Sequence, residues 1–172
     1  MKSIRDICAI LVESNVIASS DIVKIESLFQ REPNVGVVSA VVKACPSVTM
    51  TVVMRALSQF YSIPILDISA FDLSIMPKDI LSINEMINNK WIPLSKRNNR
   101  LKLAVVDPSN LSVIKQLSFK LNLAIDLVLV DQRQLEIVFN KNSKQYFKTI
   151  NLDDDSLAGI EMTGDIQDNS EM

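Results

Sequence analysis

The stretch WIPLSKRNNRLKLAVVDPSN, residues 91–110, decides the fold class of this chain. Residues 91–95 predict a strand, and Pro93 favours a sheet edge for it because proline lacks the N–H that an inner strand must donate. The polar run 96–100 predicts a turn and residues 101–106 a second strand, so the two strands form a β-hairpin. The sequence DPSN that follows predicts a turn that also caps a helix.

Short strands and helices flank this hairpin on both sides. Before it, residues 64–68 predict a buried strand, and Pro77 is expected at the first position of a helix that runs through Ile87. After it come a helix from Leu111, a strand over 125–130 and a last helix capped by Asp131. The order β-α-β-β-α-β-α over residues 61–146 contains the split βαβ arrangement of ferredoxin-like α+β folds.

Residues 1–60 predict a helical subdomain. Ile4, Ile7 and Leu11 recur at helical spacing, and Asn15 is expected to close that first helix. Ser19 or Ser20 then offers an N-cap for a second helix.

The second half of this subdomain resembles the first. Residues 37–44 are β-branched and compatible with a strand, but their helical neighbours favour a short helix, and Ser47 or Thr49 is expected to cap the next one. Residues 6–29 and 37–60 superpose at a spacing of 31 residues. This internal similarity indicates either a duplicated helical hairpin or two generic helix pairs.

The charge of the chain is unevenly distributed. The net charge is −2, yet seven of the 20 acidic residues follow Lys148, and no Lys or Arg does. The part before this acidic stretch carries 18 basic and 13 acidic residues, which leaves about +5. Such a balance is compatible with an acidic protein partner or a membrane surface and does not demand nucleic acid.

The residues that most enzymes need are missing. The chain has no histidine, no GxxxxGK[ST] or GxGxxG loop, and only three glycines, which excludes Ser-His and Cys-His pairs and a glycine-rich phosphate cradle. Cys8 and Cys45 are interpreted as buried thiols of a reducing cytosol, although a disulfide between them is conceivable. We therefore expect no catalytic residue, no cofactor and no metal site.

Two groups of charged residues are candidates for a function. Asp67 and Asp72 are expected to bond nearby backbone N–H groups in turns or caps, and Asp107 to sit in a turn. The hairpin is basic. Its cationic side chains are either solvated at the tip of the hairpin or contact an acidic partner. These candidate contact residues are Lys96, Arg97, Arg100 and Lys102.

The helical and strand periodicity stops near residue 147. Residues 147–172 hold two of the three glycines and the acidic run Asp153-Asp154-Asp155. Such a composition predicts a flexible, disordered acidic tail, or a linker to a further domain. The acidic run is expected to be solvated and not to form a cation site.

Residues 56–140 resemble the N-terminal domain of type IV pilus assembly and type II secretion ATPases (PilB and GspE types). The resemblance rests on ALSQFYSIPILDISAFDLSIMPKDIL, on WIPLSKRNNRLKLAVVDPSNLSVIKQLSF and on LVLVDQRQLEIVF. In that family a proline-started helix, a P-L strand, a basic hairpin and an L-x-V-A-x-x-D-P-x-N segment follow one another. The stretch 61–146 is thus expected to be an α+β docking domain between the helical subdomain and the tail.

The resemblance implies a role in a motor. Such ATPases form hexameric rings that drive pilus or pseudopilus polymerisation, with their catalytic motifs in a C-terminal core. We expect this chain to be their non-catalytic docking and regulatory module, cytoplasmic and peripheral to the inner membrane. Its partners would be an inner-membrane platform protein or a cytoplasmic assembly protein, with no nucleic acid and only indirect membrane contact. A further interpretation is that the chain is a free-standing regulatory protein.

One branch of this family binds cyclic-di-GMP through a tandem helical motif that begins R-L-G and has a second glycine seven residues on. The corresponding positions hold Asp6, Cys8 and Asn15 in the first copy. In the second copy they hold Val37, Ser39 and Pro46. We expect the helical scaffold to be kept and the nucleotide site to be absent, with cyclic-di-GMP sensing as the alternative function.

Overall fold

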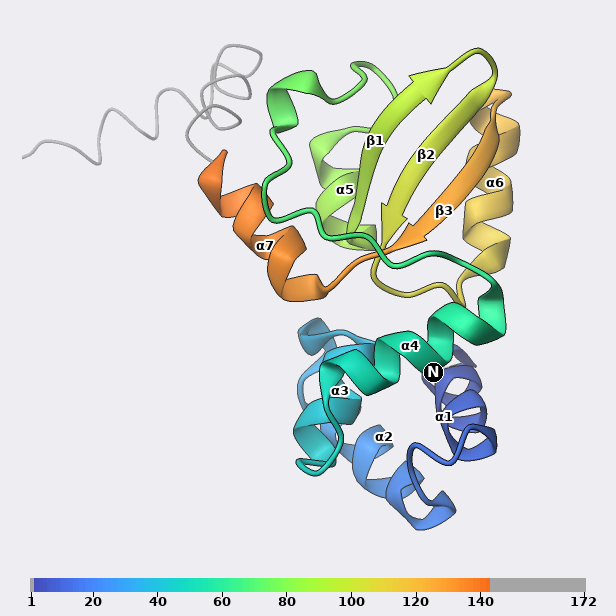
Figure 1. Ribbon diagram of the computed structural model, residues 1–172, viewed down its shortest axis with the longest axis vertical. Coiled ribbons are helices and arrows are strands. Elements are labelled where there is room, and N and C mark those ends of the chain that lie inside the picture. The colour runs from blue at the N-terminus through green and yellow to red at the C-terminus, as the bar shows by residue number, and fades with distance from the viewer. Residues whose placement is uncertain (1, 143–172) are drawn as a thin grey trace, which may run out of the picture.

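The structure of the chain is a computed structural model that describes residues 2–142 (Figure 1). Four helices come first, followed by a small sheet with three further helices. The first four are α1 (Lys2–Glu13), α2 (Ile22–Arg31), α3 (Val37–Ala44) and α4 (Met50–Tyr61). The predicted α+β class, with an N-terminal helical bundle followed by a small sheet and further helices, is confirmed, whereas the predicted β-α-β-β-α-β-α order lacks its first strand.

The four N-terminal helices enclose one apolar core. Its side chains come from the helical-period positions of each helix, as amphipathic helices require, and several are completely buried. The helix α3 belongs to this bundle, so the preference for a helix over a strand at residues 37–44 is confirmed. The fully buried members include Ile4, Ile7, Leu11, Ile25 and Leu57.

The ends of these helices follow local capping chemistry. Asn15 has φ 57°, the left-handed conformation that stops a helix. Thr49 is the N-cap of α4, and its Oγ1 accepts a hydrogen bond from the N–H of Val52 at 3.3 Å. The prediction of Ser19 or Ser20 as a cap was wrong. Both lie inside a 3₁₀ turn, so α2 starts one turn later with Asp21 at its N-cap position.

The sheet has three strands in the order β1-β2-β3: β1 (Trp91–Arg97), β2 (Arg100–Val105) and β3 (Ala124–Leu129). The strands β1 and β2 form the predicted antiparallel hairpin, and β2 pairs with β3 in parallel. Pro93 lies on an edge strand, as predicted, and the register shifts between Pro93 and Ser95.

Helices cover both faces of the sheet (Figure 1). One face packs on α6 (Leu111–Leu121), and α5 (Ile83–Asn89) lies beside β1. The other face is covered by the segment that follows α4 and by α7 (Gln132–Lys141). Asp131 caps α7 as expected, because its carboxylate accepts a hydrogen bond from the N–H of Arg133 at 2.8 Å.

The predicted strand at residues 64–68 was wrong. Only a single bridge forms, between Ile65 and Leu129. Pro64 has no N–H to donate, and the Asp67 carboxylate accepts hydrogen bonds from the N–H and Oγ of Ser69, which turns the chain away from the sheet.

The predicted helix from Pro77 was also wrong in its start. Asp79 has a positive φ of 62°, which breaks the helical path. The helix α5 begins at Ile83 instead, behind a capping box in which Ser82 and Glu85 bond each other's backbone N–H.

The helical bundle and the sheet are packed directly against each other. The bundle core includes Ile63 and Leu129. Gly36, just before α3, has φ 83° and ψ 154° and faces the buried side chain of Gln132 at the start of α7. The Oγ of Ser39 lies 3.4 Å from the Oε1 of Gln132. The predicted acidic tail, residues 147–172 with Asp153–155, lies outside the described residues.

Candidate docking face

The basic hairpin presents its cations on two different faces of the sheet. In the register, Ser95 lies opposite Lys102, Arg97 opposite Arg100, and Lys96 opposite Leu101. Residues that face each other across two strands point to the same side, and neighbours along a strand alternate. Arg97, Arg100 and Lys102 therefore share one side of the sheet, whereas Lys96 points to the other.

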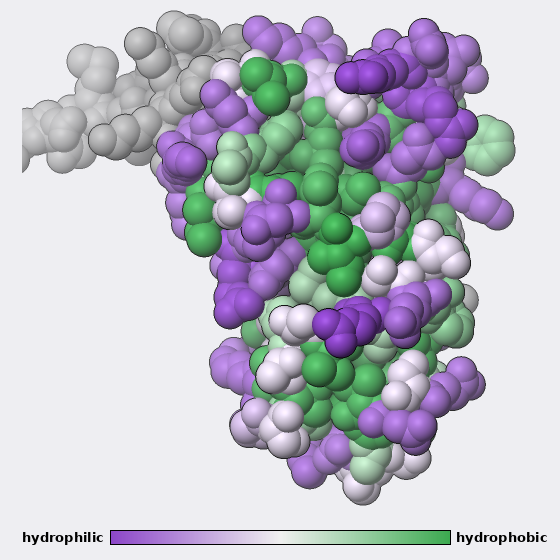
Figure 2. Space-filling view, viewed as in Figure 1, coloured by the Kyte–Doolittle hydropathy of each residue, from purple (hydrophilic) through white to green (hydrophobic). Residues whose placement is uncertain are grey.

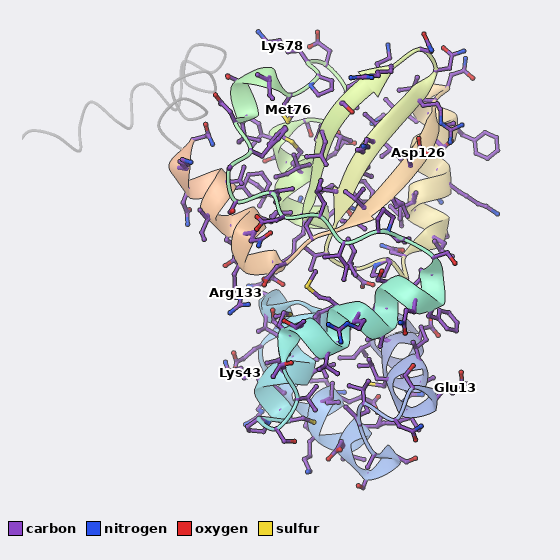
Figure 3. The ribbon with its side chains drawn as sticks, viewed as in Figure 1. Glu13, Lys43, Met76, Lys78, Asp126 and Arg133 are labelled. Atoms are coloured by element: carbon purple, nitrogen blue, oxygen red, sulfur yellow. The ribbon has the colours of Figure 1, made fainter. Side chains whose placement is uncertain are left out.

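These three cations line a shallow hollow of about 360 Å³, together with Ser95, Asn98 and Asp126. We call this site the basic hollow. Hydrophilic side chains gather at this end of the molecule (Figure 2), and Asp126 lies near the end of the sheet that carries the hairpin (Figure 3).

One carboxylate partly neutralises the basic hollow. The Nε of Arg100 donates to the Oδ2 of Asp126 at 2.9 Å, and its Nη2 forms an ion pair with Oδ1. The Arg100 guanidinium holds the pKa of the Asp126 carboxyl below its usual value. Arg97 and Lys102 make no salt bridge within the described part of the chain. The basic hollow thus contains three cations and one anion. This excess of positive charge suits the carboxylates of a partner.

The structure groups three of the four predicted contact residues and separates the fourth. Lys96 lies opposite Leu101, between Ser95 and Arg97 on β1, so the alternation of side chains along the strand turns it to the other side. Sequence reasoning missed Asp126, because it joins the site only through the parallel pairing of β3 with β2, in which Asp126 lies opposite Lys102.

The other acidic candidates take the structural roles that were predicted. The Asp72 carboxylate accepts a hydrogen bond from the N–H of Ser74, and Asp67 holds the Ser69 turn. The Oδ1 of Asp107 accepts hydrogen bonds from the N–H and Oγ of Ser109 at 2.9 and 2.6 Å. Asp107 therefore orders the turn before α6.

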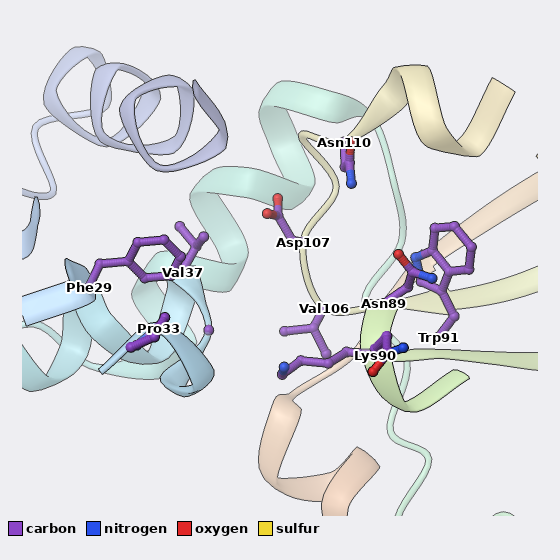
Figure 4. Close-up of a pocket in the computed structure, with 11 residues that line it drawn as sticks. Phe29, Pro33, Val37, Asn89, Lys90, Trp91, Val106, Asp107 and Asn110 are labelled. Carbon is purple, nitrogen blue, oxygen red and sulfur yellow. The ribbon is translucent and has the colours of Figure 1, made fainter. Parts of the chain in front are cut away.

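A second hollow of about 200 Å³ lies between the bundle and the sheet (Figure 4). Phe29, Pro33 and Val37 line one side of it, and Lys90 and Trp91 belong to the other. Lys90 has a positive φ of 56° because it ends α5 in the left-handed conformation.

The described residues offer little for metal or thiol chemistry. Within residues 2–142, no group of three or more His, Cys, Asp or Glu side chains is arranged to hold a metal ion. Cys8 and Cys45 are buried free thiols, as expected, and burial raises the pKa of Cys8 to about 11. None of the described helices has the length and apolar character needed to cross a bilayer.

Comparison with known proteins identifies the sheet-containing part. Residues 61–145 match the family model of the MshEN domain. The chain carries an MshEN domain. This span covers the sheet, α5, α6 and α7, and therefore the whole basic hollow.

The chain is also similar to a pilus assembly ATPase over most of its length. The type IV pilus assembly ATPase PilB of Pseudomonas aeruginosa is 24% identical over 153 residues, which are 88% of this chain and 27% of PilB. The chain thus spans about a quarter of the length of this relative. The resemblance to the N-terminal domain of type IV pilus assembly and type II secretion ATPases is confirmed.

Two solved structures share the fold. A structure of MshE with cyclic-di-GMP matches with a TM-score of 0.59 and 17% identity, over 78% of this chain and 96% of that one. The N-terminal domain of XpsE matches with a TM-score of 0.54 and 17% identity, over 78% and 91%. At this identity the likeness concerns the fold.

Proposed function

We propose that the chain is a non-catalytic docking module of a type IV pilus assembly ATPase, or of the related secretion ATPases. In this role the docking domain at residues 61–146, which contains the MshEN match at 61–145, binds an acidic surface of an inner-membrane platform protein or a cytoplasmic assembly protein. The helical subdomain at 1–60 supports it, and a hexameric motor is attached beyond it. The module acts at the cytoplasmic side of the inner membrane.

The observation that carries this proposal is the excess of positive charge in the basic hollow. Arg97 and Lys102 are exposed, have no salt-bridge partner among the described residues, and lie on one face with Arg100. A positive patch of this kind speeds encounter with an acidic partner and fixes its orientation.

Two charge-reversal variants, one inside the basic hollow and one outside it, test the proposal. The Arg97→Glu/Lys102→Glu variant is expected to bind the purified cytoplasmic region of the platform protein at least about tenfold more weakly than the unmodified chain. The control variant Lys96→Glu/Lys115→Glu changes the net charge equally, but both positions lie outside the basic hollow and are exposed. Equal weakening by the two variants, or none by either, would contradict the proposal.

Cyclic-di-GMP sensing is the second candidate, and the fold likeness to MshE solved with this nucleotide favours it. The residues at the expected motif positions argue against it. Asp6 brings a negative charge where a phosphate would need a cation, and the side chains of Cys8 and Val37 are buried in the bundle core. We therefore propose that the scaffold is kept without this ligand.

Calorimetric titration of the full chain with cyclic-di-GMP distinguishes the two functions. The docking proposal predicts no heat of binding at any attainable nucleotide concentration. Micromolar binding would establish the sensing function instead.

A further inference from the structure

The acidic residues at the end of the chain and the basic hollow have opposite charge. After Lys148 the sequence contains seven acidic residues and no basic one, and three of the acids are consecutive at Asp153, Asp154 and Asp155. The basic hollow presents three cationic side chains, of which only Arg100 is held by a carboxylate of the described residues. The acidic run thus offers as many anions as the hollow has cations.

The chain is long enough to bring the two together. The helix α7 ends at Lys141, so Asp153 follows it by 12 residues. An extended chain of that length spans about 40 Å. The three-stranded sheet is only about 10 Å wide between its outer strands, and its seven-residue strand β1 is about 23 Å long, so a segment of 40 Å exceeds both dimensions of the sheet. A tether this short holds the acidic run at a millimolar effective concentration near the sheet.

We propose that residues 153–155 dock in the basic hollow of the same chain. Their carboxylates form ion pairs with Arg97 and Lys102 and share the guanidinium of Arg100 with Asp126. The contact is electrostatic and exposed, so it weakens as the salt concentration rises. A second consequence rests on the proposed function: the acidic run competes with the acidic partner for the same cations.

Two variants of the full chain with equal charge change test the docking. Asp153→Asn/Asp154→Asn/Asp155→Asn removes the acidic run. Glu161→Gln/Asp165→Asn/Asp168→Asn removes the same number of charges further along. We expect the first variant, and not the second, to shift the backbone amide resonances of residues 95–102 at low salt. High salt should produce the same shifts in the unmodified chain.

Three results would overturn the proposal. Equal shifts in both variants would show a non-specific effect of net charge, and no shift in either would show that the run does not dock. Shift differences that grow with protein concentration would assign the contact to a second copy of the chain. The peptide TINLDDDSLA, residues 149–158, should restore the original resonances when added to the Asp153→Asn/Asp154→Asn/Asp155→Asn variant.

The competition is measured separately from the docking. The Asp153→Asn/Asp154→Asn/Asp155→Asn variant is expected to bind the cytoplasmic region of the platform protein several-fold more tightly than the unmodified chain does. If this partner does not bind any variant, the proposed function fails, whereas the resonance shifts still decide whether the acidic run occupies the hollow. Unchanged affinity in a partner that does bind would refute the competition.

Discussion

The contact between Gly36 and Gln132 joins the helical bundle to α7, and substituting the glycine should break it. A Cβ at position 36 would lie 2.2 Å from the Oε1 of Gln132 and 3.2 Å from its Cδ. Gln132 is only 6% exposed, so its side chain has little room to move, and its Nε2 donates to the Oε1 of Glu136 at 2.9 Å. The backbone at Gly36, with φ 83° and ψ 154°, is in a region that essentially only glycine adopts.

Two costs determine the magnitude for Gly36→Ala. The backbone conformation costs about 1–3 kcal/mol for a residue with a side chain. Displacing the buried amide of Gln132 from its partners costs about 1–2 kcal/mol more. We therefore expect the free energy of unfolding to fall by about 2–5 kcal/mol.

Urea unfolding followed by circular dichroism measures this loss, and a double-mutant cycle separates its parts. In a Gln132→Ala background the obstruction is gone, so Gly36→Ala should cost only the backbone strain of about 1–3 kcal/mol. A loss below about 0.5 kcal/mol in the unmodified background, or equal losses in both backgrounds, would refute the described packing of α3 against α7.

Further substitutions test other local features. Thr49→Ala removes the N-cap of α4 and should lower the unfolding free energy by about 1 kcal/mol, whereas Thr49→Ser should restore most of it. Burial raises the pKa of Cys8 from 9.0 to about 11, so the folded chain holds that proton more tightly than the unfolded chain. Stability present below pH 9.0 should therefore decline as the pH rises towards about 11, and a Cys8→Ala variant should show a smaller decline in urea midpoints. Asp126→Asn should cost less than about 1 kcal/mol, because its ion pair with Arg100 is exposed. The pKa of Asp126 is lowered by Arg100, so its contribution is present at neutral pH and lost as the pH falls through the folded pKa, an acid dependence that the Asn variant should lack.

The fold was predictable where periodicity and capping chemistry agree. The hairpin over β1 and β2 has a polar turn between two apolar runs, and Thr49 and Asp131 cap the helices expected of them. The prediction of secondary structure failed where the backbone conformation of a single residue, or its missing N–H, prevents an apolar stretch from forming the expected strand or helix. At residues 64–68 the missing N–H of Pro64 and the Asp67 turn limit pairing to one bridge, and near Pro77 the positive φ of Asp79 delays the helix.

The candidate site was predictable in composition and not in geometry. The four cations of the hairpin are visible as a cluster in the sequence. Treating the four cations as one cluster overlooked the alternation of side chains along β1, which places Arg97 and Lys96 on opposite sides of the sheet. The presence of Asp126 depends on a strand that follows about 25 residues later and pairs in parallel, which no local pattern encodes.

Lysine modification of the assembled motor–platform complex tests the central claim most directly. Lys102 belongs to the basic hollow, whereas Lys96, six positions away along the hairpin, points to the other side of the sheet. The experiment uses the Asp153→Asn/Asp154→Asn/Asp155→Asn background, in which the acidic run of the chain itself no longer covers Lys102. Docking through the basic hollow predicts that acetylation of Lys102 slows on complex formation while Lys96 reacts as fast as in the free chain. Equal rates for Lys102 in the free and assembled states would contradict the account.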